Sequence, residues 1–174
     1  MSGIVLGPVT RQAGHVRLRE WDPGTAPPVE IDAWLRAYNE SLAADLPEDP
    51  QWSSTMLREY LTVTMPGERR LTWLAEDDDG TMLGYGRLLI LSDLGVLELY
   101  VTPGGRNRGV GRALLTELAT ICADRGYARM EWWVLDWNEP AHRFYRGVGA
   151  EPQDDWTVWR VTDESLKALG SRPK

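Results

Sequence analysis

The amino-acid sequence predicts an α/β fold in which a mixed β-sheet carries helices on both faces. Apolar residues recur at strand and helix periods in the order strand, two helices, three strands, helix, strand, helix, strand. Three consecutive strands before the first strand–helix–strand unit are typical of a mixed sheet. The 174 residues suffice for one domain with a hydrophobic core and are too few for two of average size.

The start of the chain differs in pattern from its body. Residues 1–14 are glycine-rich and weakly patterned, which predicts a flexible N-terminal extension, and residues 15–170 are expected to form a single domain. No apolar run approaches the ~20 residues that span a bilayer, and the start lacks the basic and apolar segments of a secretory signal. We therefore expect no membrane partner and a cytoplasmic location.

A strand and two helices are predicted first. Alternation over residues 15–21 indicates the strand. Apolar residues at the helical period over residues 31–46 indicate the first helix. Residues 53–64 indicate the second helix, with Ser53 or Ser54 as its N-cap.

Three strands follow in succession. Residues 71–75 and 81–91 read as strands joined by a hairpin turn at Asp78-Asp79-Gly80. Residues 94–101 form a third, strongly apolar strand.

The C-terminal part alternates between helices and strands. Residues 110–125 carry a clear apolar face and predict a helix that Gly126 closes as its C′ residue. Residues 129–136 predict a strand. The last predicted elements are a short helix over residues 140–146 with proline in its first turn, a strand over residues 156–161 and a short helix capped by Asp163.

Composition excludes several kinds of site. The net charge of −7 and the pI near 4.9 argue against a nucleic-acid partner, which needs a basic surface. The same charge is compatible with plain solubility or with an acidic cleft that concentrates a cationic substrate. The single cysteine, Cys122, lies in an apolar pattern and is expected to be a buried core residue. The two histidines stand far apart, so no metal site is predicted.

The strongest local signal is the glycine-rich turn RNRGVG at residues 106–111, between a strand and a helix. Backbone amides at a helix N-terminus, together with the helix dipole, form an anion site. Gly109 and Gly111 let a phosphate approach the backbone, and three nearby arginines add positive charge. An ordinary turn with solvated arginines remains the alternative on this segment alone. The triphosphate loop and the dinucleotide fingerprint are excluded, because Gly-Lys-Ser/Thr and GxGxxG are absent here.

The run Val101-Thr-Pro-Gly-Gly-Arg106-Asn-Arg-Gly109-Val-Gly111, followed by Ala113-Leu-Leu, resembles the pyrophosphate-binding motif of the GNAT acetyltransferases. The resemblance implies a mostly antiparallel sheet of six to seven strands with a central V-shaped splay between two parallel strands. It also implies that backbone amides after Arg106 hold the pyrophosphate of acetyl-CoA and that a strand edge pairs with the pantetheine arm. The implied cofactor-binding residues are Leu99, Tyr100, Val101, Arg106, Asn107, Arg108, Gly109, Val110, Gly111, Arg112, Asn138 and Tyr145.

A second string, Asn138-Glu-Pro-Ala-His-Arg-Phe144-Tyr145, is similar to the N-x-x-A-x-x-F-Y string of the same family. By this resemblance Asn138 contacts the cofactor and Tyr145 lies near its sulfur. A phenol with a reference pKa of ~10 can protonate a departing thiolate, so Tyr145 is the candidate general acid. The alternative is that Phe144 and Tyr145 are only packed aromatics of an amphipathic helix.

The resemblance to the polyamine and thialysine branch of this family covers residues 97–169. His142 departs from that pattern, where an aliphatic residue is usual. Residues 1–80, which shape the acceptor pocket, do not match, so polyamine specificity does not follow.

Glu98 is the candidate general base. It lies in a strand that faces the thioester in the resembled family, where many members have an acidic residue that removes the amine proton. The alternative is a structural ion pair with Arg87 on the neighbouring strand. Asp136 and Glu131 are weaker candidates.

An acceptor pocket is expected around residues 38–52, where Tyr38, Trp52 and Glu48 combine aromatic and acidic groups that suit a protonated amine. A solvated charged loop is the alternative.

Together these features predict an acetyl-CoA-dependent N-acetyltransferase that acts on a primary amine of a small molecule by direct attack in a ternary complex. Two alternatives remain: a non-catalytic module that binds or senses acyl-CoA, and an acetyltransferase for protein or peptide amines. A homodimer is compatible with the sequence.

Overall fold

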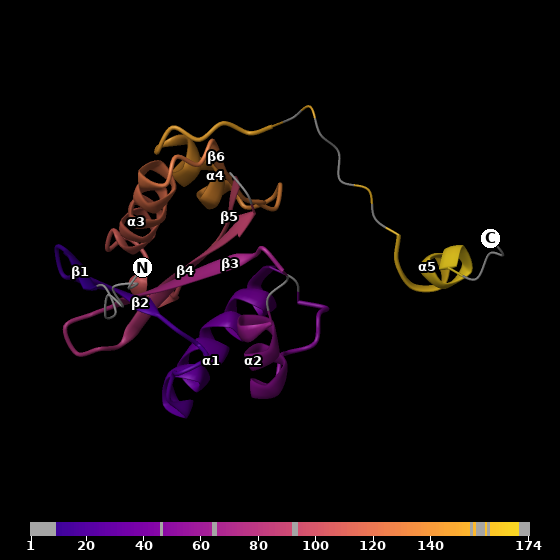
Figure 1. Cartoon of the computed structure of the whole chain (residues 1–174), viewed down its shortest axis with the longest axis horizontal. Coiled ribbons are helices and arrows are strands. Elements are labelled where there is room, and N and C mark those ends of the chain that lie inside the picture. Colours follow the sequence, from indigo (N-terminus) through magenta and orange to yellow (C-terminus); the bar gives the residue numbers. More distant parts are fainter. Residues whose placement is uncertain are drawn as a thin grey trace, which may run out of the picture. The chain divides into compact units, whose positions relative to one another are not determined.

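The computed structural model describes residues 10–45, 47–63, 66–91, 94–153, 155, 159 and 161–170. The chain forms two compact units, divided between Trp133 and Val134. The first unit holds the sheet and three α-helices, and the second holds two short helices (Figure 1). The predicted single domain over residues 15–170 stays a prediction.

The first unit is built on a six-stranded sheet whose strands lie in sequence order. The strands are β1 (Thr10–Ala13), β2 (Val16–Trp21), β3 (Arg69–Glu76), β4 (Met82–Leu91), β5 (Leu94–Val101) and β6 (Arg129–Glu131). The first five pair antiparallel, and only β5 and β6 pair in parallel. This confirms the predicted mixed, mostly antiparallel sheet.

The parallel pair separates after three residues. β6 pairs only with Leu94, Gly95 and Val96, whereas β5 continues to Val101. Among the described residues, the second half of β5 therefore has no partner strand on that side. This is the splay that the sequence resemblance implied.

Helices cover both faces of this sheet (Figure 1). The helices of the first unit are α1 (Pro28–Asp45), α2 (Ser54–Thr62), the 3-10 turn η1 (Pro103–Gly105) and α3 (Val110–Asp124). Strand register places Leu74, Tyr85 and Tyr100 side by side on the face that packs against α1 and α2. Alternate side chains of a strand point to opposite faces of the sheet. The other face of this sheet packs against α3.

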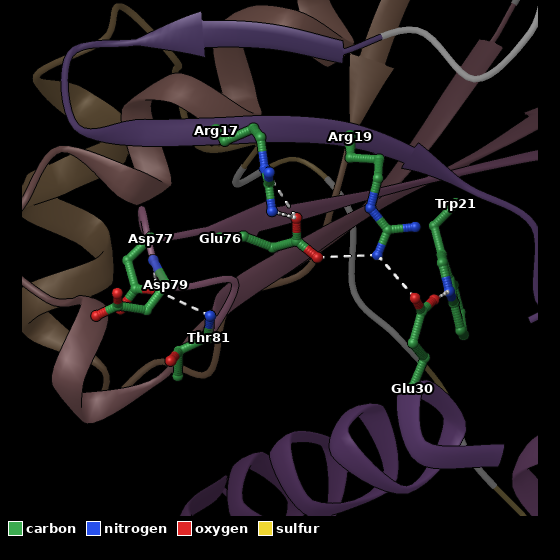
Figure 2. Close-up of polar contacts among 8 residues, drawn as sticks. All are labelled: Arg17, Arg19, Trp21, Glu30, Glu76, Asp77, Asp79 and Thr81. Atoms are coloured by element: carbon green, nitrogen blue, oxygen red, sulfur yellow. Dashed lines mark hydrogen bonds and ion pairs between the residues drawn. The ribbon is translucent and has the colours of Figure 1, made fainter. Parts of the chain in front are cut away.

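An ion-pair network joins the N-terminal edge of the sheet to α1 (Figure 2). The buried carboxylate of Glu76 accepts hydrogen bonds from Arg17 at 2.9 Å and from Arg19 at 2.8 Å. Arg19 also lies 3.3 Å from Glu30 of α1, whose carboxylate accepts a hydrogen bond from the Trp21 indole at 2.6 Å. The network ties β2, β3 and the first turn of α1 together, and every charge in it has an opposite partner.

The hairpin between β3 and β4 turns where the sequence predicted. The Asp77 side chain accepts hydrogen bonds from the backbone amides of Asp79 at 3.1 Å and Thr81 at 2.8 Å (Figure 2). Gly80 has a φ of +80°, a left-handed conformation that favours glycine. The predicted turn at residues 78–80 is confirmed.

Several predicted elements have different bounds in the structure. The segment predicted as a flexible extension contains β1, which pairs with β2 over Thr10–Ala13, and residues 1–9 lie outside the described part. The strand predicted over residues 129–136 ends at Glu131, because its later residues form no ladder with a described strand. α1 begins at Pro28, whose fixed φ suits the first helical turn.

The second unit contains α4 (Glu139–Arg146) and α5 (Asp163–Gly170). Both short helices were predicted. The strand predicted over residues 156–161 lies outside the described residues except for Trp159 and Val161, which belong to no strand.

Gly86 gives the sheet room for α3, and its replacement tests this packing. A Cβ added there would lie 2.9 Å from Leu118 Cδ1. We expect Gly86→Val to lower the free energy of unfolding by about 1–3 kcal/mol, as overpacked cores do. Urea denaturation of the variant measures this change.

Gly104→Ala is the matched control, because a Cβ at Gly104 meets no heavy atom within 4 Å. Its free energy of unfolding should stay within about 0.5 kcal/mol of the parent's. Equal stability of the Gly86 and Gly104 variants would show that α3 does not pack as described.

Candidate functional site

The loop between β5 and α3 has an unusual backbone. β5 ends at Val101, and the next turn packs so tightly on β4 that a Cβ at Gly105 would lie 2.4 Å from the Leu83 carbonyl oxygen. Asn107 and Gly109 then adopt positive φ values of 58° and 79°. These left-handed residues turn the chain sharply into α3.

The N-terminus of α3 carries no side-chain cap. Its N-cap residue is Gly109, whereas Ser53 caps α2 by accepting a hydrogen bond from the Met56 amide at 3.3 Å. The Ala113 amide makes a 2.9 Å bond to the Gly109 carbonyl, and helix geometry leaves the earlier amides of the turn without intrahelical acceptors. This end of the helix is therefore suited to bind an anion.

Three exposed arginines surround the uncapped turn and raise its positive charge. Arg106 and Arg108 lie in the loop, and Arg112 lies in the first turn of α3. The second half of β5, with Leu99, Tyr100 and Val101, leads directly into this loop. The predicted cofactor-binding residues of the first unit therefore lie along one segment, in which β5 leads into the loop and the N-terminus of α3.

Glu98 lies on β5 opposite Arg87 of β4. Its Oε2 atom accepts hydrogen bonds from Arg87 at 3.0 Å and from the Tyr60 hydroxyl at 3.1 Å. Its Oε1 atom accepts one from the Tyr85 hydroxyl at 3.0 Å. The Glu98 side chain is 32% exposed while that of Arg87 is only 8% exposed, so the carboxylate is the accessible charge of the pair.

Aromatic rings line the region around Glu98. The Tyr38 ring lies 4.9 Å from Trp52 and 6.1 Å from Tyr60, and Trp52 lies 5.1 Å from Tyr60. Asn39 fixes the Trp52 backbone through hydrogen bonds of 2.8 and 3.0 Å. We call Tyr38, Trp52 and Tyr60 the aromatic wall.

The tyrosines near Glu98 have raised pKa values. Burial, reinforced by the charge of Glu98, raises the pKa of Tyr38 to about 12. The same two causes raise the pKa of Tyr60 and raise that of Tyr85 well above its usual value. At neutral pH these phenols are therefore hydrogen-bond donors.

The structure brings together only part of the predicted acceptor pocket. Tyr38 and Trp52 belong to the aromatic wall, but Glu48 lies on an exposed loop. Its neighbour Asp49 is the acidic residue of that loop whose charge acts on Tyr38. Glu131, a weaker candidate for the base, pairs with Arg129 at 2.6 Å.

The sequence analysis missed Tyr60 and Tyr85, and it anticipated Arg87 only as an alternative partner of Glu98. Tyr85 and Arg87 alternate along β4, so the register of the β4–β5 hairpin could have placed both beside Glu98. Tyr60 comes from a helix 38 residues away in sequence and carries no such signal.

In the second unit, Asn138 is the N-cap of α4, and its side-chain oxygen accepts a hydrogen bond from the Ala141 amide at 3.3 Å. Tyr145 lies on the same helix in edge contact with Phe144, at 5.1 Å between ring centres. Burial raises the pKa of Tyr145 to about 12. Tyr145 is thus a phenol that keeps its proton through the physiological range.

Cys122 is buried on α3, and burial raises the pKa of its thiol. The reactive form of cysteine is the thiolate, so this site does not suit a nucleophile. The described residues contain no cluster of three or more side chains that could hold a metal ion. None of the helices described is long and apolar enough to cross a membrane.

Comparison with known proteins finds a family model and relatives that are named as acetyltransferases. The model of the family described as "Acetyltransferase (GNAT) family" matches residues 30–150. L-ornithine N5-acetyltransferase NATA1 of Arabidopsis thaliana is 35% identical over 72 residues, which are 41% of this chain and 32% of that protein. Thialysine N-epsilon-acetyltransferase of Caenorhabditis elegans is 44% identical over 72 residues, which are 40% of this chain and 45% of that protein. The chain thus spans less than half the length of these two curated relatives.

Among solved structures, the integron cassette protein VCH_CASS6 from the mobile metagenome of V. cholerae has the same fold. The TM-score is 0.71 at 20% identity, and the match covers 92% of this chain and 100% of that one.

The raised pKa of Tyr145 can be tested by titration. Because its pKa is raised to about 12, it should stay protonated while an ordinary phenol ionises near pH 10. Ultraviolet titration of Tyr145→Phe should therefore overlay that of the parent up to about pH 11. A variant curve that lacks one tyrosine's absorbance change centred near pH 10 would show that Tyr145 is not desolvated.

Proposed function

The chain belongs to the acetyltransferase (GNAT) family, and we propose that it is an acetyl-CoA-dependent N-acetyltransferase for a primary amine of a small molecule. The observation that carries this proposal is the uncapped N-terminus of α3, directly after a strand whose edge lacks a partner in the described structure. A cytoplasmic location and a homodimer stay predictions from the sequence.

The cofactor site would use backbone more than side chains. The amides at the start of α3 suit the pyrophosphate of acetyl-CoA, and the N-cap residue, Gly109, makes no side-chain cap. Beyond Val96, β5 has no described strand beside it on the β6 side, and the backbone of this half would offer hydrogen-bonding groups to the amide-bearing pantetheine arm. The predicted contact of Asn138 with acetyl-CoA rests on the sequence resemblance.

The acceptor would be recognised as a cation. Glu98 presents an accessible carboxylate beside the aromatic wall, and both attract an ammonium group. The names of two relatives point the same way, since L-ornithine and thialysine are both amines. Tyr38 and Trp52 are the proposed contacts, with Glu48 contributing only from its exposed loop.

The reaction would be a direct attack in a ternary complex. The bound ammonium group first loses one proton to solvent, and its neutral nitrogen then attacks the thioester carbonyl carbon. The second proton lost by the nitrogen goes to Glu98, and Tyr145 protonates the departing thiolate. Glu98 then releases its proton to solvent, and Tyr145 takes up a proton from solvent. Buried Cys122, with its raised pKa, gives no support for a covalent acetyl-enzyme.

Gly111→Val tests the cofactor site, because it places a branched side chain in the first turn of α3. For the parent we expect acetyl-CoA at about 100 times its Kd to stabilise the fold by about 2.7 kcal/mol. This stabilisation should vanish in Gly111→Val. Thermal unfolding with and without acetyl-CoA measures it.

Ala119→Val is the matched control, since it adds similar bulk at an exposed position of the same helix. It should respond to acetyl-CoA like the parent. If folded Gly111→Val also responds like the parent, the cofactor binds elsewhere.

Tyr145→Phe tests the general acid, because it removes one hydroxyl and keeps the ring. We expect kcat to fall by about 10²–10⁴-fold while the Kd for acetyl-CoA stays unchanged. Steady-state kinetics and a separate binding measurement give both values.

Tyr127→Phe serves as the control for loss of a tyrosine hydroxyl outside the proposed site and should keep the parent's kcat. A Tyr145→Phe kcat within about threefold of the parent would leave Tyr145 a packing residue only, since loss of a general acid is far larger.

A further inference from the structure

Two tyrosine hydroxyls donate to the same carboxylate, but only one belongs to an exposed side chain. Tyr60 lies 3.1 Å from Glu98 Oε2 and Tyr85 lies 3.0 Å from Glu98 Oε1. Tyr60 is 36% exposed, whereas Tyr85 is 1% exposed. A ligand arriving from solvent can therefore meet Tyr60 and cannot meet Tyr85.

Arg87 holds both Tyr60 and Glu98 in place. Its guanidinium donates to Glu98 Oε2 at 3.0 Å and lies 4.4 Å from the centre of the Tyr60 ring. Arg87 itself is buried, so this arrangement is protected from solvent. The buried arginine thus orients the carboxylate and the more exposed of the two tyrosines toward each other.

The Glu98 Oε2 atom is already occupied. It accepts from both Tyr60 and Arg87, and a carboxylate oxygen has two lone pairs. A proton that came directly to this atom would have to displace one of these donors. A proton that enters through the Tyr60 hydroxyl follows a hydrogen bond that is already formed.

The surroundings of the Tyr60 hydroxyl suit a docked amine. Tyr38 and Trp52 pack against the ring of Tyr60, whose hydroxyl donates to Glu98, so the aromatic wall adjoins this hydrogen bond. Burial and the charge of Glu98 raise the pKa of Tyr60, which keeps the hydroxyl protonated and donating before the reaction.

We propose that Tyr60 relays the proton from the attacking amine to Glu98, an inference that rests on the proposed acetyl transfer. As the carbon–nitrogen bond forms, the nitrogen loses a proton to the phenolic oxygen of Tyr60. At the same time, the Tyr60 hydroxyl proton passes to Glu98 Oε2. Tyr60 ends the step neutral, Glu98 ends it protonated, and the carbon–sulfur electron pair leaves with the thiolate. Tyr85 and Arg87 act as positioning residues for the carboxylate.

Paired variants of the 174-residue chain separate a relay from simple positioning. Tyr60→Phe and Tyr85→Phe each remove one hydrogen bond to Glu98 and keep the ring. CoA thiol release would be measured with acetyl-CoA and, in turn, L-ornithine, L-lysine and 1,3-diaminopropane. We expect Tyr60→Phe to lower kcat by about 100-fold or more and Tyr85→Phe by less than about tenfold, with the KM for the amine within about threefold of the parent in both.

A double-mutant cycle with Glu98→Gln keeps the inference testable if the single variants differ in stability. Without the carboxylate, the relayed proton has no acceptor. Tyr60→Phe should therefore cause no further loss of kcat in the Glu98→Gln background. Equal losses for Tyr60→Phe and Tyr85→Phe in an active parent, or additive losses for Tyr60→Phe and Glu98→Gln, would overturn the relay alone. No thiol release by the parent with any of the three amines would instead contradict the proposed function and the relay with it.

Discussion

The ion pair between Arg87 and Glu98 is the interaction on which the rest of the site depends. The two residues face each other across β4 and β5, with the arginine buried and the carboxylate partly exposed. A buried guanidinium without its counter-charge is unfavourable, so the pair fixes both side chains. The Tyr60 and Tyr85 hydroxyls donate hydrogen bonds to the carboxylate of this pair, and its guanidinium lies over the Tyr60 ring.

One strand, β5, links this pair to the proposed cofactor site. Its face carries Glu98, its ladder with β6 ends at Val96, and its end leads into the glycine loop and the start of α3, whose N-cap is Gly109. On the other side of the sheet, a Cβ at Gly86 would lie 2.9 Å from Leu118 Cδ1 of α3, and one at Gly95 would lie 2.8 Å from Leu88 Cδ1 and 3.0 Å from Cys122 Sγ of α3. Packing of α3 therefore sets the position of the proposed pyrophosphate site relative to β5.

Local signals explain which features could be predicted from the sequence. β5, α3 and the turn between them combine a dense apolar pattern with glycines and arginines at fixed spacing, and all were found. β1 was missed because all four of its residues are exposed and carry no apolar alternation. Whether Glu98 pairs with Arg87 stayed open, because the sequence analysis did not assign the register of the β4–β5 hairpin. Tyr60 was missed because it reaches Glu98 from α2, far away along the chain.

The central claim is that this chain transfers an acetyl group and does not merely bind acyl-CoA. The direct measurement uses acetyl-CoA with a ¹³C-labelled acetyl group, a mixture of primary amines and mass spectrometry of the products. The account predicts a labelled N-acetyl amine and one CoA thiol released for each acetyl group transferred. Saturable binding of acetyl-CoA without amine-dependent release of CoA would contradict it and would identify a binding module.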